Sequence, residues 1–208
     1  MAGFTAVAAV GKSIERLLAR AFLERAPVPN RVTKAALIRT EDLATEAQIR
    51  QLLGDHGLTI LLYRVDFNKT MRAAWSAVSQ LDGRGHLALD LHYLLTPWAE
   101  NAEHQHMIIG RAMQVIERIA MLSGPLLYEP ALPPTAEYAD EPRASATDSV
   151  QLVLEEISTE ALMRTFDSLP SDYRLSVPYV ARVVRIDTQA DIVTPPVTDA
   201  KTHLRVGA

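Results

Sequence analysis

Four of the six histidines of this 208-residue chain fall between residues 86 and 106, among several carboxylates. Imidazole and carboxylate groups are the side chains that bind zinc and that transfer protons near neutral pH. The first question is therefore whether this segment forms a metal site or an acid–base site. The histidines are His86, His92, His104 and His106, and the carboxylates are Asp90, Glu100 and Glu103.

Two of these histidines fall in a segment from Asn101 to about Met121 whose apolar spacing predicts a helix. Side chains two residues apart on a helix diverge by about 200°, whereas helical zinc pairs use a spacing of four residues. His104 and His106 are therefore predicted to be structural or surface residues. The helical wheel places His106 on the packed face and His104 nearer the surface, beside Arg111.

The other two histidines belong to a segment in which apolar residues alternate strictly from residue 87 to residue 95, which predicts a β-strand. His86, Asp90 and His92 would share the more polar face of this strand. We retain a His/Asp metal-dependent hydrolase, with these residues and His104, as an alternative hypothesis. Because hydrogen-bonded histidines on a strand need no metal, we expect no metal site and no cofactor.

Other motifs that could carry chemistry are weak. The glycines of "GRG", Gly83 and Gly85, precede a strand, whereas a phosphate-binding loop precedes a helix, so they predict a turn. Glu155 and Glu156 are neighbours on a predicted strand and would point to opposite faces, as expected of a solvated sheet edge. The absence of cysteine excludes disulfides, thiolate metal sites and a cysteine nucleophile. We therefore expect no catalytic residue and no enzyme.

The composition is that of a globular protein, with 48% hydrophobic and 22% charged residues and a formal net charge of −4. Without a basic excess, nucleic acid is not an expected partner. No apolar run approaches the roughly 20 residues that cross a bilayer, and the N-terminus lacks the charged start of a signal peptide. We expect synthesis in the cytoplasm and no membrane partner.

Hydrophobic periodicity predicts both helices and strands, beginning with a long N-terminal helix. The strand at residues 58–67 is apolar on both faces, which favours a place at the centre of the sheet. The predicted helices span residues 7–26, 41–56, 101–121 and 159–169, and the predicted strands span residues 32–40, 58–67, 86–95, 149–158 and 173–187.

The last predicted strand, residues 173–187, carries Arg174 and Arg182 on its polar face, with Arg185 close to its end. Pro178 cannot donate a hydrogen bond to a neighbouring strand, so this strand is predicted to lie at a sheet edge or to be bulged there. Arginines next to acids on such a strand favour ion pairs at an interface.

Two long segments of this chain resemble a known family. The segments "LDLHYLLTPWAENAEHQHMIIGRAMQVI" and "VQLVLEEISTEALMRTFDSLPSDYRLSVPYVARVVRID" are similar to the N-terminal domain of the tail-terminator, or cap, proteins of extracellular contractile injection systems of the virulence-cassette and antifeeding-prophage type. The resemblance covers roughly residues 1–187. It implies an α/β domain with a mixed β-sheet flanked by helices, like that of phage tail terminators. Such a domain is expected to form a hexameric ring on the last layer of an inner tube and sheath and to end their polymerisation.

From the resemblance we expect a terminator-like domain at residues 1–187. Composition predicts a long loop at residues 124–149, and the lack of a sustained period predicts a C-terminal tail at residues 188–208. The expected partners are five further copies of the chain and the tube and sheath proteins of a phage tail-like particle. A monomeric adaptor that docks its N-terminal helix on a partner is the third hypothesis. The residues expected at subunit, tube or sheath interfaces are Arg111, Arg174, Pro178, Arg182 and Arg185.

Overall fold

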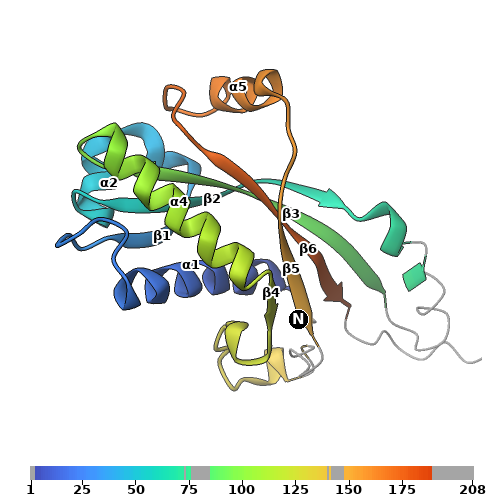
Figure 1. The fold of residues 1–208 in the computed structure, drawn as a ribbon. Coiled ribbons are helices and arrows are strands. Elements are labelled where there is room, and N and C mark those ends of the chain that lie inside the picture. The colour runs from blue at the N-terminus through green and yellow to red at the C-terminus, as the bar shows by residue number, and fades with distance from the viewer. Residues whose placement is uncertain (1–2, 73, 76–84, 140, 142–147, 189–208) are drawn as a thin grey trace, which may run out of the picture.

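The computed structural model describes residues 3–72, 74–75, 85–139, 141 and 148–188. Six strands form a single sheet in the order β1-β2-β3-β6-β5-β4 (Figure 1). β1 and β2 are parallel and the remaining pairs are antiparallel, so the predicted mixed sheet is confirmed. The strands are β1 Lys34–Ile38, β2 Gly57–Phe67, β3 His86–Trp98, β4 Met121–Ser123, β5 Ser149–Leu154 and β6 Val177–Asp187.

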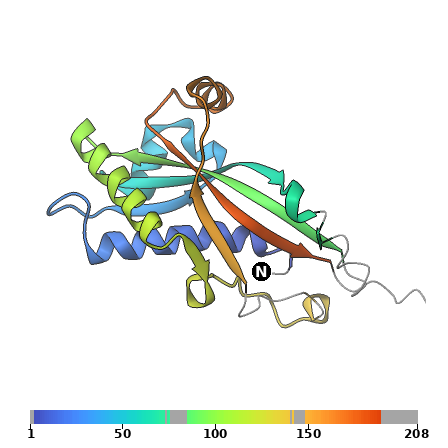
Figure 2. The same cartoon turned by 45° about the vertical axis from the view of Figure 1, so that its right-hand side comes forward.

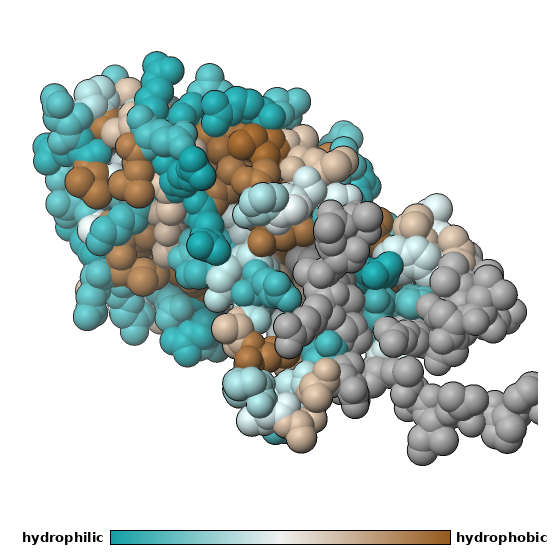
Figure 3. Space-filling model, turned by 90° about the horizontal axis from the view of Figure 1, so that it is seen from below, coloured by the Kyte–Doolittle hydropathy of each residue, from teal (hydrophilic) through white to brown (hydrophobic). Residues whose placement is uncertain are grey.

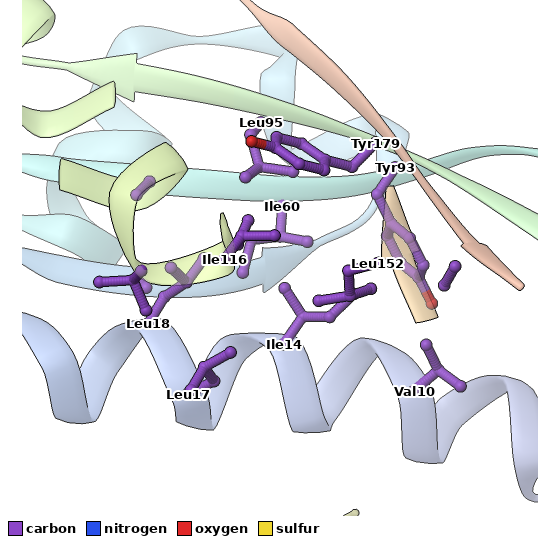
Figure 4. Packing of buried hydrophobic residues seen from close by; sticks show 14 of the residues in the cluster. Val10, Ile14, Leu17, Leu18, Ile60, Tyr93, Leu95, Ile116, Leu152 and Tyr179 are labelled. Carbon is purple, nitrogen blue, oxygen red and sulfur yellow. The ribbon is translucent and has the colours of Figure 1, made fainter. Parts of the chain in front are cut away.

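Two long helices cover one face of the sheet. The helix α1, Ala6–Glu24, confirms the predicted N-terminal helix, and α4 is Ala102–Arg118. The side chain of Asn101 caps α4 by accepting a hydrogen bond from the backbone N–H of His104. The apolar face of α1 packs on the sheet, so it is not free to dock on a partner as the adaptor hypothesis requires (Figures 1 and 4). The largest α1 side chains in this core are Val10, Ile14, Leu17, Leu18 and Phe22.

The outer surface on the α1 side is mixed in character. Figure 3 views the molecule from below and shows apolar side chains gathered in patches among hydrophilic ones. Exposed apolar residues in or next to α1 include Phe4, Leu23 and Val32. Single apolar side chains at a surface are common in proteins and by themselves indicate no site.

Among the described residues, the helices that cover the opposite face of the sheet lie at one end of it. There, the 3₁₀ helix η1 (Thr40–Ala44), α2 (Glu46–Leu53) and α5 (Thr159–Asp167) enclose a second, smaller core (Figure 2). Beyond these helices β2 becomes exposed, from Arg64 to Phe67. The residues of the second core are Ala36, Ile38, Leu43, Ile49, Leu53, Leu61, Leu94, Trp98 and Phe166.

The predicted place of β2 at the centre of the sheet is wrong. β2 lies second from one edge, and β3 and β6 occupy the centre. Both faces of β2 are covered from Gly57 to Leu61, which explains its apolar sequence, but burial on two faces does not fix the position of a strand in the sheet.

The predicted edge position of the last strand is also wrong, because β6 lies between β3 and β5, and it begins at Val177 rather than at residue 173. Pro178 is tolerated because its carbonyl accepts the N–H of Glu155, at 3.0 Å, just after the end of β5. In an antiparallel strand the N–H and the carbonyl of one residue point to the same side. The N–H that Pro178 lacks would therefore point beyond the end of β5, so its absence costs no hydrogen bond within the β5–β6 ladder. The bulge in β6 lies further along, where Arg182 and Val183 face Asp90.

The long connection at residues 124–149 contains no strand or α-helix among its described residues up to the start of β5, apart from two short 3₁₀ turns, Gly124–Leu126 and Ala136–Tyr138. Part of it packs along the N-terminal helix. The N–H of Tyr128 donates to the hydroxyl of Ser13 at 2.7 Å, and the N–H of Phe4 donates to the Glu141 carboxylate at 2.9 Å. The predicted turn at residue 83 and most of the predicted tail lie outside the described residues.

Candidate functional site

The polar residues predicted on one face of β3 do not converge on a common site. His86 binds the Asp187 carboxylate through Nδ1 at 2.6 Å, and Asp90 accepts from the Asn68 amide at 3.1 Å. His92 has other partners, described below. Within the part of the chain that the structure describes, no three His, Cys, Asp or Glu residues are grouped so that they could hold a metal ion.

The positions predicted for the two α4 histidines are reversed. His106 is exposed, whereas His104 faces the body of the molecule, with its Nδ1 3.0 Å from Nε2 of the buried His56. The packed face of α4 continues from His104 through Ile108 and Ala112, a spacing of four residues. The pKa of His56 lies below its ordinary value. Burial is the larger cause, and the charge of the neighbouring His104 is the second.

The expectation of a solvated Glu155 is wrong as well, since its side chain is only 12% exposed. Its carboxylate accepts from the hydroxyl of Tyr63 at 2.9 Å and from Arg64 at 2.8 Å, and lies 2.8 Å from Nδ1 of His92. Burial, with the hydrogen bond to Glu155, raises the pKa of Tyr63. Since every partner is a side chain of the fold, the arrangement is that of a structural ion-pair network.

A β-bulge brings this network together. The register of β2 against β3 shifts between Leu62 and Arg64, which adds Tyr63 as an extra residue and sets Arg64 opposite His92. The network thereby links β2 and β3 to the residue that follows β5, although β6 separates those strands. The local sequence does not predict this bulge, because the register of β2 depends on its pairing with the distant β3.

Three of the arginines expected at interfaces differ in the contacts that their side chains make. Arg182 is exposed on the sheet face opposite α1 and α4, and its side chain has no hydrogen bond or ion pair among the described residues. Arg185 binds Asp187 at 3.1 Å. Arg111 donates to Gln114 at 2.8 Å and approaches the Ala21 carbonyl of α1 at 3.5 Å.

Arg174 lies at the opposite end of β6. Its guanidinium carbon is 4.2 Å from the centre of the Trp98 ring, a cation–π contact, and it forms an ion pair with Glu46. Its Nε is buried without a hydrogen-bond partner among the described residues. Arg174 therefore connects the end of β3 to the start of α2.

Arg174 also lines a hollow with a volume of about 710 Å³, which we call the α5 groove. Its apolar lining includes Trp98, Met163, Phe166 and Tyr173, and the rings of Phe166 and Tyr173 meet edge to face at 5.3 Å. Three carboxylates, Glu46, Asp167 and Asp172, also line it. Of these residues, the sequence analysis had singled out only Arg174.

Comparison with known proteins places the chain in a family. A family model described as the Pvc16 N-terminal domain matches residues 9–199. The chain belongs to this family. The match spans most of the chain, so the resemblance stated from the sequence is confirmed. No curated protein sequence matches the chain.

Two solved structures resemble the chain at 18% sequence identity. One is a sheath/tube terminator, in the extended state, of an extracellular contractile injection system (PVC); the similarity covers 97% of this chain and 64% of that one, with a TM-score of 0.54. The other is the tube-terminating cap of the anti-feeding prophage, with 94% and 60% covered and a TM-score of 0.47. The chain thus spans less than two thirds of either protein. The first similarity confirms the tail-terminator-like fold.

None of the described helices is both long enough and apolar enough to cross a membrane.

Proposed function

We propose that this chain is a structural cap of a contractile injection system, which forms a hexameric ring at the baseplate-distal end and stops tube and sheath polymerisation. The observation that carries the proposal is the family match over residues 9–199, supported by the fold shared with a sheath/tube terminator. The proposed partners are five other copies, the tube protein and the sheath protein. The protein would then be a component of a phage tail-like particle.

The pairing of the polar side chains supports a role without catalysis. His86, His92 and Glu155 each bind other side chains of the fold rather than facing a common cavity. A nucleophile or general base must instead reach a substrate. The separation of His86 from Asp90 also argues against the hydrolase hypothesis, since each has its own partner.

A closed ring uses two different surfaces of each copy, because its interface is heterologous. The sheet offers two such regions at opposite ends of β6: the uncovered face with Arg182 and Arg185, and the α5 groove with Arg174. We propose these arginines as interface residues, together with Arg111 on α4. Pro178 is buried, so its proposed role is to shape the start of β6.

The test is the mass of the purified protein by light scattering over a range of concentrations, alone and with the tube and sheath proteins. We expect six-copy rings, or tubes of uniform length only when this protein is present. A monomer at every concentration, without effect on tube length, would contradict the proposal.

A further inference from the structure

The α5 groove carries features of a docking site for a segment of protein. We propose that the groove of one copy receives residues 201–206, "KTHLRV", of a neighbouring copy. This inference rests on the proposed ring, because it requires a second copy beside the first.

The groove combines an aromatic lining with an acidic rim. Trp98 and Phe166 are buried, while Tyr173 and Met163 are 51% and 48% exposed and form accessible apolar walls. Buried aromatic pockets of this kind are where interface energy concentrates. The groove therefore fits an apolar side chain of a partner.

The carboxylates at the rim of the groove indicate which charge the docked segment should carry. Glu46 is already paired with Arg174, whereas among the described residues neither Asp167 nor Asp172 has an ion pair. Two free carboxylates beside an aromatic lining favour a segment that carries basic and apolar side chains together. An acidic segment would be repelled by the same rim.

Residues 201–206 have this composition in alternating order. Lys201 and Arg205, with His203 between them, alternate with Leu204 and Val206. In an extended segment, alternate side chains point to opposite sides, so one side would be basic and the other apolar. The apolar side would contact the aromatic walls, and the basic side would face the rim.

The direction of β6 favours a neighbouring copy over the same chain. β6 starts at Val177, three residues after Arg174, and its 11 residues carry the chain about 33 Å, to Asp187. Residues 188–200 would have to reverse and remain nearly extended to reach their own groove, since 13 residues span at most roughly 45 Å. A head-to-tail contact brings the far end of one copy to a different surface of the next, so no reversal is needed.

Photo-crosslinking of the full chain tests the proposal directly. A benzophenone amino acid replaces Leu204, and protein grown in ¹⁴N is mixed with protein grown in ¹⁵N before assembly and irradiation. Mass spectrometry should find links from residue 204 to residues 159–174, with the two ends carrying different isotopes. Links to other regions, links within one chain only, or no links would each overturn the proposal.

Charge reversal supplies a second test with a matched control. The pair Asp167→Lys and Asp172→Lys, or the pair Lys201→Glu and Arg205→Glu, should lower the yield of the groove crosslink about tenfold, whereas combining both pairs should restore it. Glu160→Lys changes the charge of α5 outside the groove lining and should leave the yield unchanged. Equal losses in all variants, or no rescue, would contradict ionic docking.

Light scattering on the same samples separates the two proposals. Hexamers without a crosslink to the groove would overturn this inference and leave the proposed function intact. Monomers at every concentration would overturn the ring and, with it, docking between copies.

Discussion

At the residue scale, Glu155 links strands that do not pair with one another. Its carboxylate has three partners, Tyr63, Arg64 and His92, and is mostly shielded from water. The substitution Glu155→Ala would leave these groups without their shared acceptor. Loss of a charged, largely buried acceptor is worth about 1–3 kcal/mol, so we expect the free energy of unfolding in urea to fall by about that amount.

The adjacent residue supplies the control for this experiment. Glu156 is exposed, and among the described residues its side chain has no hydrogen bond or ion pair. Glu156→Ala should therefore change stability by less than about 0.5 kcal/mol. Equal effects of the two substitutions would show that the Glu155 network adds nothing to stability.

The pair of His56 and His104 predicts a dependence of stability on pH. Burial lowers the pKa of His56 in the folded protein below its ordinary value of 6.5, so the unfolded chain takes up a proton first as the pH falls. The stability associated with neutral His56 is complete above pH 6.5 and decreases as the pH falls through the folded pKa. Urea unfolding at pH 7.5 and at lower pH should record this loss.

Replacement of the histidines tests the assignment. His56→Gln removes the titrating group and keeps an amide that can donate toward Nδ1 of His104, so the loss of stability below pH 6.5 should become smaller. The exposed His106 is the control, and His106→Gln should retain the full pH dependence. An unchanged profile in the His56 variant would assign the effect to other groups.

At the element scale, the junction of α2 and β2 depends on close packing at one glycine. A Cβ on Gly57 would lie 2.7 Å from Cβ of Leu53, a buried residue at the end of α2. Gly57→Ala forces the helix away from the strand and should lower the free energy of unfolding by about 1–3 kcal/mol. Thermal and urea unfolding measure this change.

Gly110 provides the opposite case within α4. A Cβ there would meet nothing within 4 Å, and the residue is exposed in the middle of the helix. Gly110→Ala should therefore stabilise the protein by about 0.5–1 kcal/mol, because alanine loses less backbone entropy in a helix. A destabilised Gly110 variant would mean that the surroundings of α4 are tighter than the structure describes.

Most of the elements were accessible from sequence, because α1, α4 and five of the six strands follow local periodicity, whereas the short strand β4 was not predicted. The order of strands was not, since it depends on pairing between distant segments. Pro178 illustrates the limit: a proline suggests an edge, but its position beyond the end of β5 allows it inside the sheet. Likewise, the bulge at Tyr63 decides which side chains meet His92.

The candidate site was predictable only in part, for a related reason. The charge of Arg174 was enough to single it out in the sequence. Its contact with Trp98 was not predictable, because it brings the end of β3 next to the segment before β6, and these are far apart in the sequence. The acidic residues of the α5 groove come from the start of α2, the last residue of α5 and the segment after α5, which the sequence does not place together. Tertiary structure alone assembles these residues.

At the scale of the whole molecule, the described helices cover most of one face of the sheet and a smaller part of the other. α1 and α4 cover the first face, whereas α2 and α5 leave the far halves of β2, β3 and β6 open (Figures 1 and 2). The open part carries paired charges, with Arg182 as an exposed cation that has no ion pair among the described residues. Such a surface remains soluble in a monomer and can still form ion pairs in a ring.

Arg182 and Arg174 should therefore respond differently to loss of charge. Arg182→Gln removes an exposed charge, so we expect the free energy of unfolding to change by less than about 0.5 kcal/mol while ring assembly, measured as mass by light scattering, shifts to higher protein concentration. Arg174→Gln removes the contacts with Trp98 and Glu46 and should lower stability as well as assembly. Arg50, exposed on α2, is the control for nonspecific charge effects. If Arg182→Gln and Arg50→Gln assemble like the unmodified chain, the open sheet face is not the ring interface, and the second surface must lie elsewhere.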